Sequence, residues 1–131
     1  MWLYVEKCFA DYCNFSGRAS RKEYWYFFLF NTIISNFLGI LYAFAFSVRS
    51  YVLLFIFFCL AIVYTLVVLL PSIAVSVRRL HDTGKSATWL FIVLIPLVGF
   101  IWLLMFMLEP GMEGDNRYGM DPKTLSIEDE I

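Results

Sequence analysis

The chain has 131 residues, of which 61% are apolar, 20% aromatic and 16% charged. Soluble proteins are about 45–50% apolar, so this composition excludes an ordinary soluble domain. The formal net charge of −1 is not that of a nucleic-acid-binding protein, and we expect no nucleic-acid partner.

The first 23 residues are polar and aromatic, and their last part belongs to the motif FSGRASRKEYW at residues 15–25. Ser20 followed by Glu23 has the spacing of a capping box, in which each side chain satisfies a free backbone N–H of the first helical turn. The first long helix is therefore predicted to begin near Arg21.

Three stretches, residues 24–48, 50–77 and 86–108, carry no charged residue. Each is long enough for a helix that crosses a hydrocarbon core, which takes about 20 residues. The sequence predicts an all-α integral membrane protein, a three-span transmembrane helical bundle with spans at about 24–46, 51–77 and 87–108. Residues 1–122 would form a single membrane domain, and residues 123–131 a disordered acidic tail.

Two of the three spans contain features that disturb a regular helix. Pro71 lies near the end of the second span and predicts a kink, because proline removes one helix hydrogen bond. The third span is interrupted by Pro96 and Gly99. A mid-membrane kink is the favoured interpretation. The alternative is a broken helix that returns to its starting side, which requires its free backbone groups to be buried inside protein.

The orientation follows from the distribution of basic residues, which concentrate on the cytoplasmic side. A three-span arrangement places seven on the N-terminal side (Lys7, Arg18, Arg21, Lys22, Arg78, Arg79 and Lys85) and three on the other (Arg49, Arg117 and Lys123). The N-terminus is predicted to be cytoplasmic and the C-terminus outside. A third segment that turns back would instead place the tail on the cytoplasmic face.

Charged residues of the N-terminal segment and of a predicted basic turn at 78–86 should meet at the same leaflet. Cations there attract anionic lipid headgroups, and carboxylates among them could tie the two segments together as a polar lid. The plainer interpretation is a charged reversal that anchors two helix ends. The candidate anion-binding and lid residues are Arg18, Arg21, Lys22, Glu23, Arg78, Arg79, His81 and Asp82.

Catalysis finds little support in the sequence. His81 beside Asp82 has the residue types of an acid–base pair, but adjacent residues rarely face each other productively. One histidine without carboxylate helpers cannot build a metal site, so we expect no catalytic residue, metal or cofactor. The spans also lack the ionisable groups that mark ion paths, which argues against a transporter that acts as a monomer.

Polar and small residues within the spans are expected to pack helices. Asparagine and serine form hydrogen bonds between helices, and small residues one turn apart allow close approach. The candidates are Asn31, Asn36, Gly39, Ser72 and Ser76.

Three motifs in chain order carry a family resemblance: FSGRASRKEYW at 15–25, RRLHDTG at 78–84 with Trp89, and NRYG at 116–119 with Asp121 and Pro122. From Phe9 to Pro122 the chain resembles the bacterial domain-of-unknown-function family 805, which are small inner-membrane proteins. The resemblance implies a bacterial inner (plasma) membrane location and no established activity, substrate or cofactor. The matching positions are Phe15, Gly17, Arg18, Arg21, Glu23, Trp25, Arg78, Arg79, His81, Asp82, Gly84, Asn116, Gly119 and Pro122.

The third motif conflicts with the simple topology. In a three-span protein, residues 116–122 face away from the other two motifs. All three can build one site only if the third span is re-entrant or the tail folds back.

The expected function is non-enzymatic. The chain is interpreted as an accessory or interaction protein that binds anionic lipid or a partner membrane protein. The partner could also be another copy of the chain in a homo-oligomer. One rival is a subunit of an oligomeric transporter or channel. The other is a headgroup-level enzyme that uses His81 and Asp82.

Overall fold

The computed structural model describes residues 2–120 and 122, and within them it contains helices, turns and one isolated β-bridge between Asn116 and Gly119. The prediction of an all-α protein is therefore confirmed for the described part of the chain. The tail predicted at 123–131 lies outside it. The elements are α1 (Trp2–Ala10), α2 (Arg21–Ser47), α3 (Tyr51–Asp82), the 3₁₀ helix η1 (Ala87–Leu94) and α4 (Val98–Leu108).

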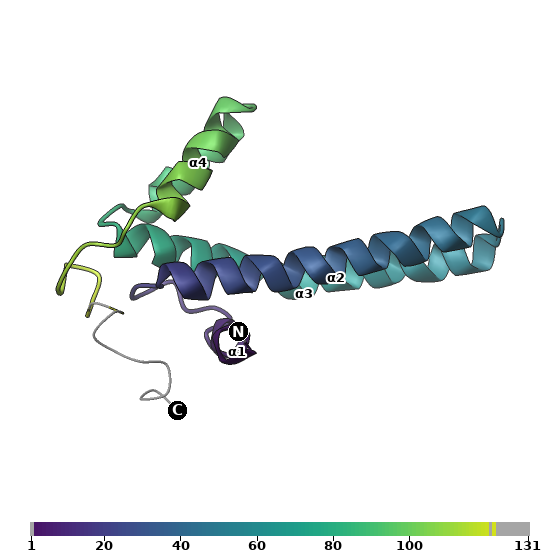
Figure 1. Ribbon diagram of the computed structural model, residues 1–131, viewed down its shortest axis with the longest axis horizontal. Coiled ribbons are helices and arrows are strands. Elements are labelled where there is room, and N and C mark those ends of the chain that lie inside the picture. The colour runs from purple at the N-terminus through teal and green to yellow at the C-terminus, as the bar shows by residue number, and fades with distance from the viewer. Residues whose placement is uncertain (1, 121, 123–131) are drawn as a thin grey trace.

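Helices α2 and α3 form a long antiparallel hairpin (Figure 1). The Ser20 half of the predicted capping box is present, since the Ser20 hydroxyl accepts the Glu23 N–H at 3.2 Å, whereas the Glu23 carboxylate pairs with Arg78. Arg49 has φ 54° in the tight turn between the helices. With 27 and 32 residues the helices are about 40 and 48 Å long at 1.5 Å per residue. Both are long and apolar enough to cross a membrane.

Helix α3 is longer than the predicted span at 51–77. It continues through Pro71 and ends at Asp82. Arg78, Arg79 and His81 therefore lie on the last turns of a helix, and the prediction of a turn that begins at Arg78 is wrong. Their side chains have buried partners on other segments, which stabilise the helix in its polar last turns.

The segment predicted as a third span is not one continuous helix. Helix η1 and helix α4 are antiparallel halves of a hairpin that branches away from α2 and α3 (Figure 1). Leu97 has φ 60° and ψ −60°, and Val98 N donates to Pro96 O at 2.7 Å, which is a γ-turn. The chain thus reverses at Pro96, and the alternative of a broken helix describes the structure.

A glycine makes this reversal feasible. A Cβ atom at Gly99 would lie 1.7 Å from the Ile92 carbonyl oxygen, so only glycine lets α4 start this close to η1. The two ends of the hairpin come together, with Lys85 Nζ 2.7 Å from Glu109 Oε2.

Apart from Ala45 beside the Arg49 turn, the buried residues of the α2–α3 hairpin lie at the opposite end from that turn. One cluster joins Val5 and Cys8 of α1 to Ala19, Phe27 and Val75. A second cluster joins Leu80 to Phe106 and Met107 of α4. The rest of the α2–α3 hairpin exposes mostly apolar side chains, as hydrocarbon requires. The N-terminal segment, the end of α3 and the C-terminal tail therefore meet in one place (Figure 1).

Candidate functional site

Six polar residues are buried where these segments meet: Arg18, Glu23, Arg78, Arg79, His81 and Asp82. All six belong to the cluster predicted from the sequence. The other two predicted members, Arg21 and Lys22, are exposed. Charged side chains are almost never fully buried unless they are paired, so the pairing of these six decides what the site can do.

Asp82 is the centre of the first half of the network. Its Oδ1 accepts from Arg18 Nε at 3.0 Å, and its Oδ2 accepts from Arg79 Nη1 at 2.5 Å. Arg18 also donates to the carbonyl oxygens of Met112 and Gly114, both at 2.6 Å. One arginine of the N-terminal segment therefore holds the end of α3 and the C-terminal tail together.

Arg79 connects the same carboxylate to helix α4. Its Nε donates to the Met107 carbonyl at 3.3 Å, and its Nη2 donates to the Glu109 carbonyl. These carbonyls lie at the C-terminal end of α4, where helix carbonyls have no intrahelical partner and the helix dipole favours a cation. Arg79 thus fixes the end of the hairpin to α3.

Glu23 is the centre of the second half. Its Oε1 accepts from Arg78 Nη1 at 2.5 Å, and its Oε2 lies 3.6 Å from Lys7 Nζ. The Cys8 thiol also donates to Oε1, with Sγ at 3.7 Å. Burial, followed by the neighbouring negative charge of Glu23, raises the pKa of the Cys8 thiol to about 12. Helix α1 is thereby attached to the start of α2.

His81 is held in one orientation by the two other motifs. Its Nδ1 lies 3.0 Å from the Gly17 carbonyl oxygen, which can only accept, so Nδ1 carries the proton. The imidazole stacks on Tyr118, with ring centroids 4.0 Å apart and an interplanar angle of 1°. Asn116 Nδ2 donates to the His81 carbonyl at 3.0 Å. Since the Asp82 carboxylate is occupied by two arginines, the geometry gives no support to a His81–Asp82 acid–base pair.

The three sequence motifs therefore meet. The segment after α4 approaches Asp82 closely at Gly111, because a Cβ atom there would lie 2.1 Å from Asp82 Oδ2. Sequence reasoning missed Cys8, Glu109 and Gly111, as well as the carbonyl oxygens that the arginines bind. The available signal was the run of glycines after α4 together with the third motif, which pointed to a tail that folds back. Among the residues that the structure describes, no three His, Cys, Asp or Glu side chains are grouped to hold a metal ion.

The predicted helix-packing residues lie in different surroundings. Asn31 Oδ1 accepts from the Tyr64 hydroxyl at 2.5 Å, which links α2 to α3. Asn36 is exposed and donates to the Thr32 carbonyl of its own helix. Ser76 likewise donates to the Ser72 carbonyl within α3. A helix-packing role for these last three residues stays a prediction.

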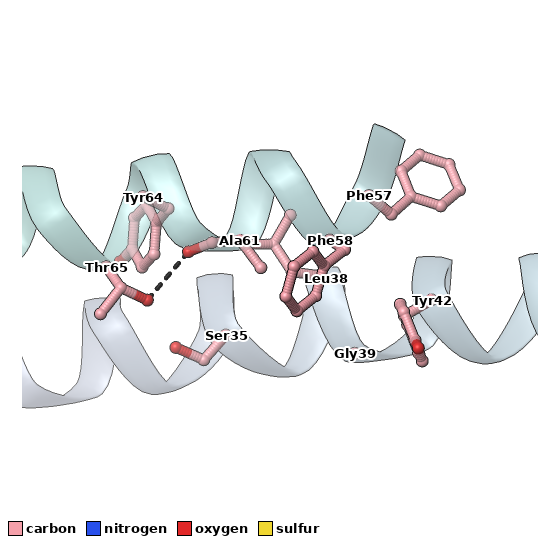
Figure 2. Close-up of a pocket in the computed structure, with 9 residues that line it drawn as sticks. All are labelled: Ser35, Leu38, Gly39, Tyr42, Phe57, Phe58, Ala61, Tyr64 and Thr65. Carbon is pink, nitrogen blue, oxygen red and sulfur yellow. Dashed lines mark hydrogen bonds between the residues drawn. The ribbon is translucent and has the colours of Figure 1, made fainter. Parts of the chain in front are cut away.

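Gly39 lines a pocket of about 300 Å³ between α2 and α3 (Figure 2). A Cβ atom added there would meet nothing within 4 Å, so the glycine is not needed for contact between these two helices. Ser35 and Thr65 also line the pocket, and the Thr65 hydroxyl donates to the Ala61 carbonyl at 2.8 Å (Figure 2). The pocket has no charged lining residue.

Comparison with known proteins gives a family but no activity. The family model described as "Protein of unknown function (DUF805)" matches residues 12–120. Inner membrane protein YhaH of Escherichia coli (strain K12) is 41% identical over 117 residues, which cover 89% of this chain and 93% of that protein. Inner membrane protein YhaI of the same organism is 39% identical over 113 residues, 86% of this chain and 89% of that protein.

A third relative is more distant. The uncharacterized protein YiiR of Escherichia coli (strain K12) is 26% identical, and the match covers 82% of this chain and 85% of that protein. No solved structure gives a significant match. The family match spans the six buried polar residues of the network, and it includes the first two motifs and residues 116–119 of the third. The chain therefore belongs to the DUF805 family of proteins of unknown function.

Proposed function

We propose that this chain is a non-enzymatic interaction protein of the bacterial inner membrane, which binds a partner membrane protein through the η1–α4 hairpin. The location is supported by the two long apolar helices and by relatives named as inner membrane proteins. The absence of an acid–base pair at His81 and Asp82 supports a role without catalysis.

The observation that carries the proposal is the turn at the tip of the hairpin. Leu94 and Leu97 are 74% and 80% exposed there, and the backbone between them leaves both helices. Irregular backbone at membrane depth is tolerated only inside protein or beside water, because lipid cannot satisfy its N–H and C=O groups. A partner that covers the tip would supply this environment.

The length of the hairpin supports a tip at this depth. Helix η1 has eight residues and α4 has eleven, so each spans about 16 Å at rises of 2.0 and 1.5 Å per residue. The hairpin is anchored at the polar network and is about half as long as the hydrocarbon core is thick. The turn would then lie near the middle of the bilayer.

The same arrangement supports an orientation with both ends in the cytoplasm. The reversal at Pro96 returns the tail to the end where the N-terminal segment lies. Among the described basic residues, Arg49 is then the only one at the opposite end. This asymmetry is stronger than the one expected for three spans, and basic residues favour the cytoplasmic side. Exposed Arg21 and Lys22 would face anionic lipid there.

Photocrosslinking in intact membranes tests the proposal. A photoreactive residue at Leu97 should give a discrete protein adduct, either with another membrane protein or with a second copy of the chain. Ile40 on α2, which is 67% exposed, is the matched control and should react with lipid. Only lipid adducts at both positions would contradict a protein partner at the tip.

A further inference from the structure

Arg78 uses only one side of its guanidinium group. Its Nη1 pairs with Glu23 Oε1 at 2.5 Å and lies 3.5 Å from Asp11 Oδ2. Its Nε and Nη2 are buried and have no hydrogen-bond partner among the described residues. A buried donor without an acceptor destabilises the protein, and more so when it is charged. Nε and Nη2 of Arg78 therefore need a hydrogen-bond acceptor.

The two other buried arginines are different. Arg18 and Arg79 each donate from Nε, Nη1 and Nη2. Their acceptors are the Asp82 carboxylate and backbone carbonyls that the fold places around them. The network therefore satisfies its arginines fully wherever they serve only to hold segments together. Arg78 departs from this pattern at a single edge.

That edge has a definite chemical preference. Nε–H and one Nη2–H leave the planar guanidinium on the same side and nearly parallel to each other. Two such donors match two oxygens of one carboxylate or phosphate, which is the geometry of bidentate arginine pairs. The acceptor that fits the free edge best is an anion with two oxygens.

The charge of the network favours an anion as well. Three arginines, which are at most 7% exposed, face two carboxylates, which are 2% exposed. Lys7 and Asp11 lie at the margin of the network and offset each other. The buried part therefore carries one more positive than negative charge, and a bound anion would balance it.

Helix α1 packs against this part of the network and also makes aromatic contacts with α2, among them Tyr4 with Tyr26 and Phe9 with Phe27. Val5 and Cys8 are its buried side chains. Its nearby ionic contacts, Lys7 with Glu23 at 3.6 Å and Asp11 with Arg78 at 3.5 Å, are long and partly exposed. Such pairs contribute little to stability. A shift of α1 would expose Arg78 and displace Asp11, the partly exposed second carboxylate beside its guanidinium after Glu23.

We infer that the Nε and Nη2 edge of Arg78, beneath α1, binds a phosphate-class anion. The source is either the phosphodiester of a lipid headgroup or free phosphate, since both present the same pair of oxygens. This site goes beyond the proposed function, because it needs neither the hairpin nor a protein partner. Loss of the Leu97 crosslink would leave it intact.

The test uses the full chain, purified in detergent and stripped of lipid. Thermal unfolding is followed while inorganic phosphate, phosphatidylglycerol or zwitterionic phosphatidylcholine is added. A raised midpoint with phosphatidylglycerol alone identifies a lipid headgroup, and a raised midpoint with millimolar phosphate identifies a free anion. No shift with either anion overturns the inference, because a water molecule would then suffice for Arg78.

Two variants locate the effect. Arg78→Lys keeps the charge opposite Glu23 but loses the two-donor edge, so the affinity for the anion should fall at least about tenfold. Arg49→Lys makes the same change at an exposed arginine in the turn at the opposite end of the α2–α3 hairpin and should bind like the wild type. An equal response of Arg78→Lys and wild type overturns the inference.

Asp11→Asn keeps the inference testable if Arg78→Lys does not fold. This variant leaves Arg78 in place and removes the negative charge that lies 3.5 Å from its Nη1. The affinity for the anion should rise several-fold. An unchanged or lower affinity contradicts a site at Arg78 beneath α1.

Discussion

At the scale of single residues, the network depends on close approach as much as on charge. Asp82 holds arginines on both of its oxygens, and Gly111 lies against that carboxylate. Removing one partner of a buried ion pair costs about 3–5 kcal/mol, because the remaining charge stays buried. A glycine therefore matters here as well as the charged residues, because it leaves the space that the carboxylate occupies.

Gly111→Ala is expected to destabilise the protein by about 1–3 kcal/mol, as overpacking does. The added methyl would lie 2.1 Å from Asp82 Oδ2, and the carboxylate cannot retreat without leaving Arg18 or Arg79. The midpoint of thermal unfolding in detergent should fall. Gly39→Ala is the matched control, since nothing lies within 4 Å of its added methyl. Equal midpoints for the two variants would show that the carboxylate has room to move.

Cys8 and Cys13 should differ in reactivity between about pH 7 and about pH 9. The thiolate is the reactive form, and a pKa of about 12 keeps the buried Cys8 thiol protonated throughout this range. Cys13 is exposed. Mass spectrometry of maleimide-treated protein should find the label on Cys13 and little on Cys8, with both labelled after unfolding. Equal labelling rates in the folded state would place Cys8 outside the network.

The charged residues at the centre of the network and their pairing could be predicted from the sequence, but the backbone acceptors could not. Arginines and carboxylates at the ends of apolar spans are expected to pair across segments. Glu23 and Asp82 each pair with an arginine of another segment, as expected. The acceptors in the tail are backbone carbonyls, such as those of Met112 and Gly114. Every residue has a carbonyl, so no residue type marks these acceptors. Only the fold selects them.

At the scale of elements, the sequence located helix starts better than helix ends. Ser20 and Ser50 cap α2 and α3 with their side chains. A short local sequence pattern can predict such caps. The end of α3 at Asp82 depends on tertiary partners, so charged residues that looked like a turn are helical. The break at Pro96 was visible, but a kink and a reversal share the same local signal. What separates them is the contact of Gly99 with Ile92 and of Lys85 with Glu109.

A zero-length carbodiimide crosslink between Lys85 and Glu109 is expected in membranes. Their charged groups are 2.7 Å apart, whereas the ends of one continuous helix over this segment would be about 36 Å apart. Peptide mass spectrometry should detect the joined pair, and Glu109→Gln should abolish it. Modification of both side chains without the crosslink would favour a continuous third span.

At the scale of the whole molecule, the structure separates a polar end from an apolar stem. Each charged segment contributes to the polar end: the N-terminal segment, the last turns of α3 and the tail. The stem is the α2–α3 hairpin, and the η1–α4 hairpin branches from the polar end. This division explains why three motifs far apart in the sequence resemble a single family. They are parts of one network.

The same division predicts that both ends of the chain lie in one compartment. With two crossing helices and a hairpin that returns, a reporter active only in the cytoplasm should be active when fused after Ile131 and also when fused before Met1. A reporter that requires the periplasm should be active only when inserted at Arg49. Three full spans would give the opposite result for the C-terminal fusion alone. That outcome would separate Asn116 from His81 by the thickness of the bilayer, and the buried network could not exist.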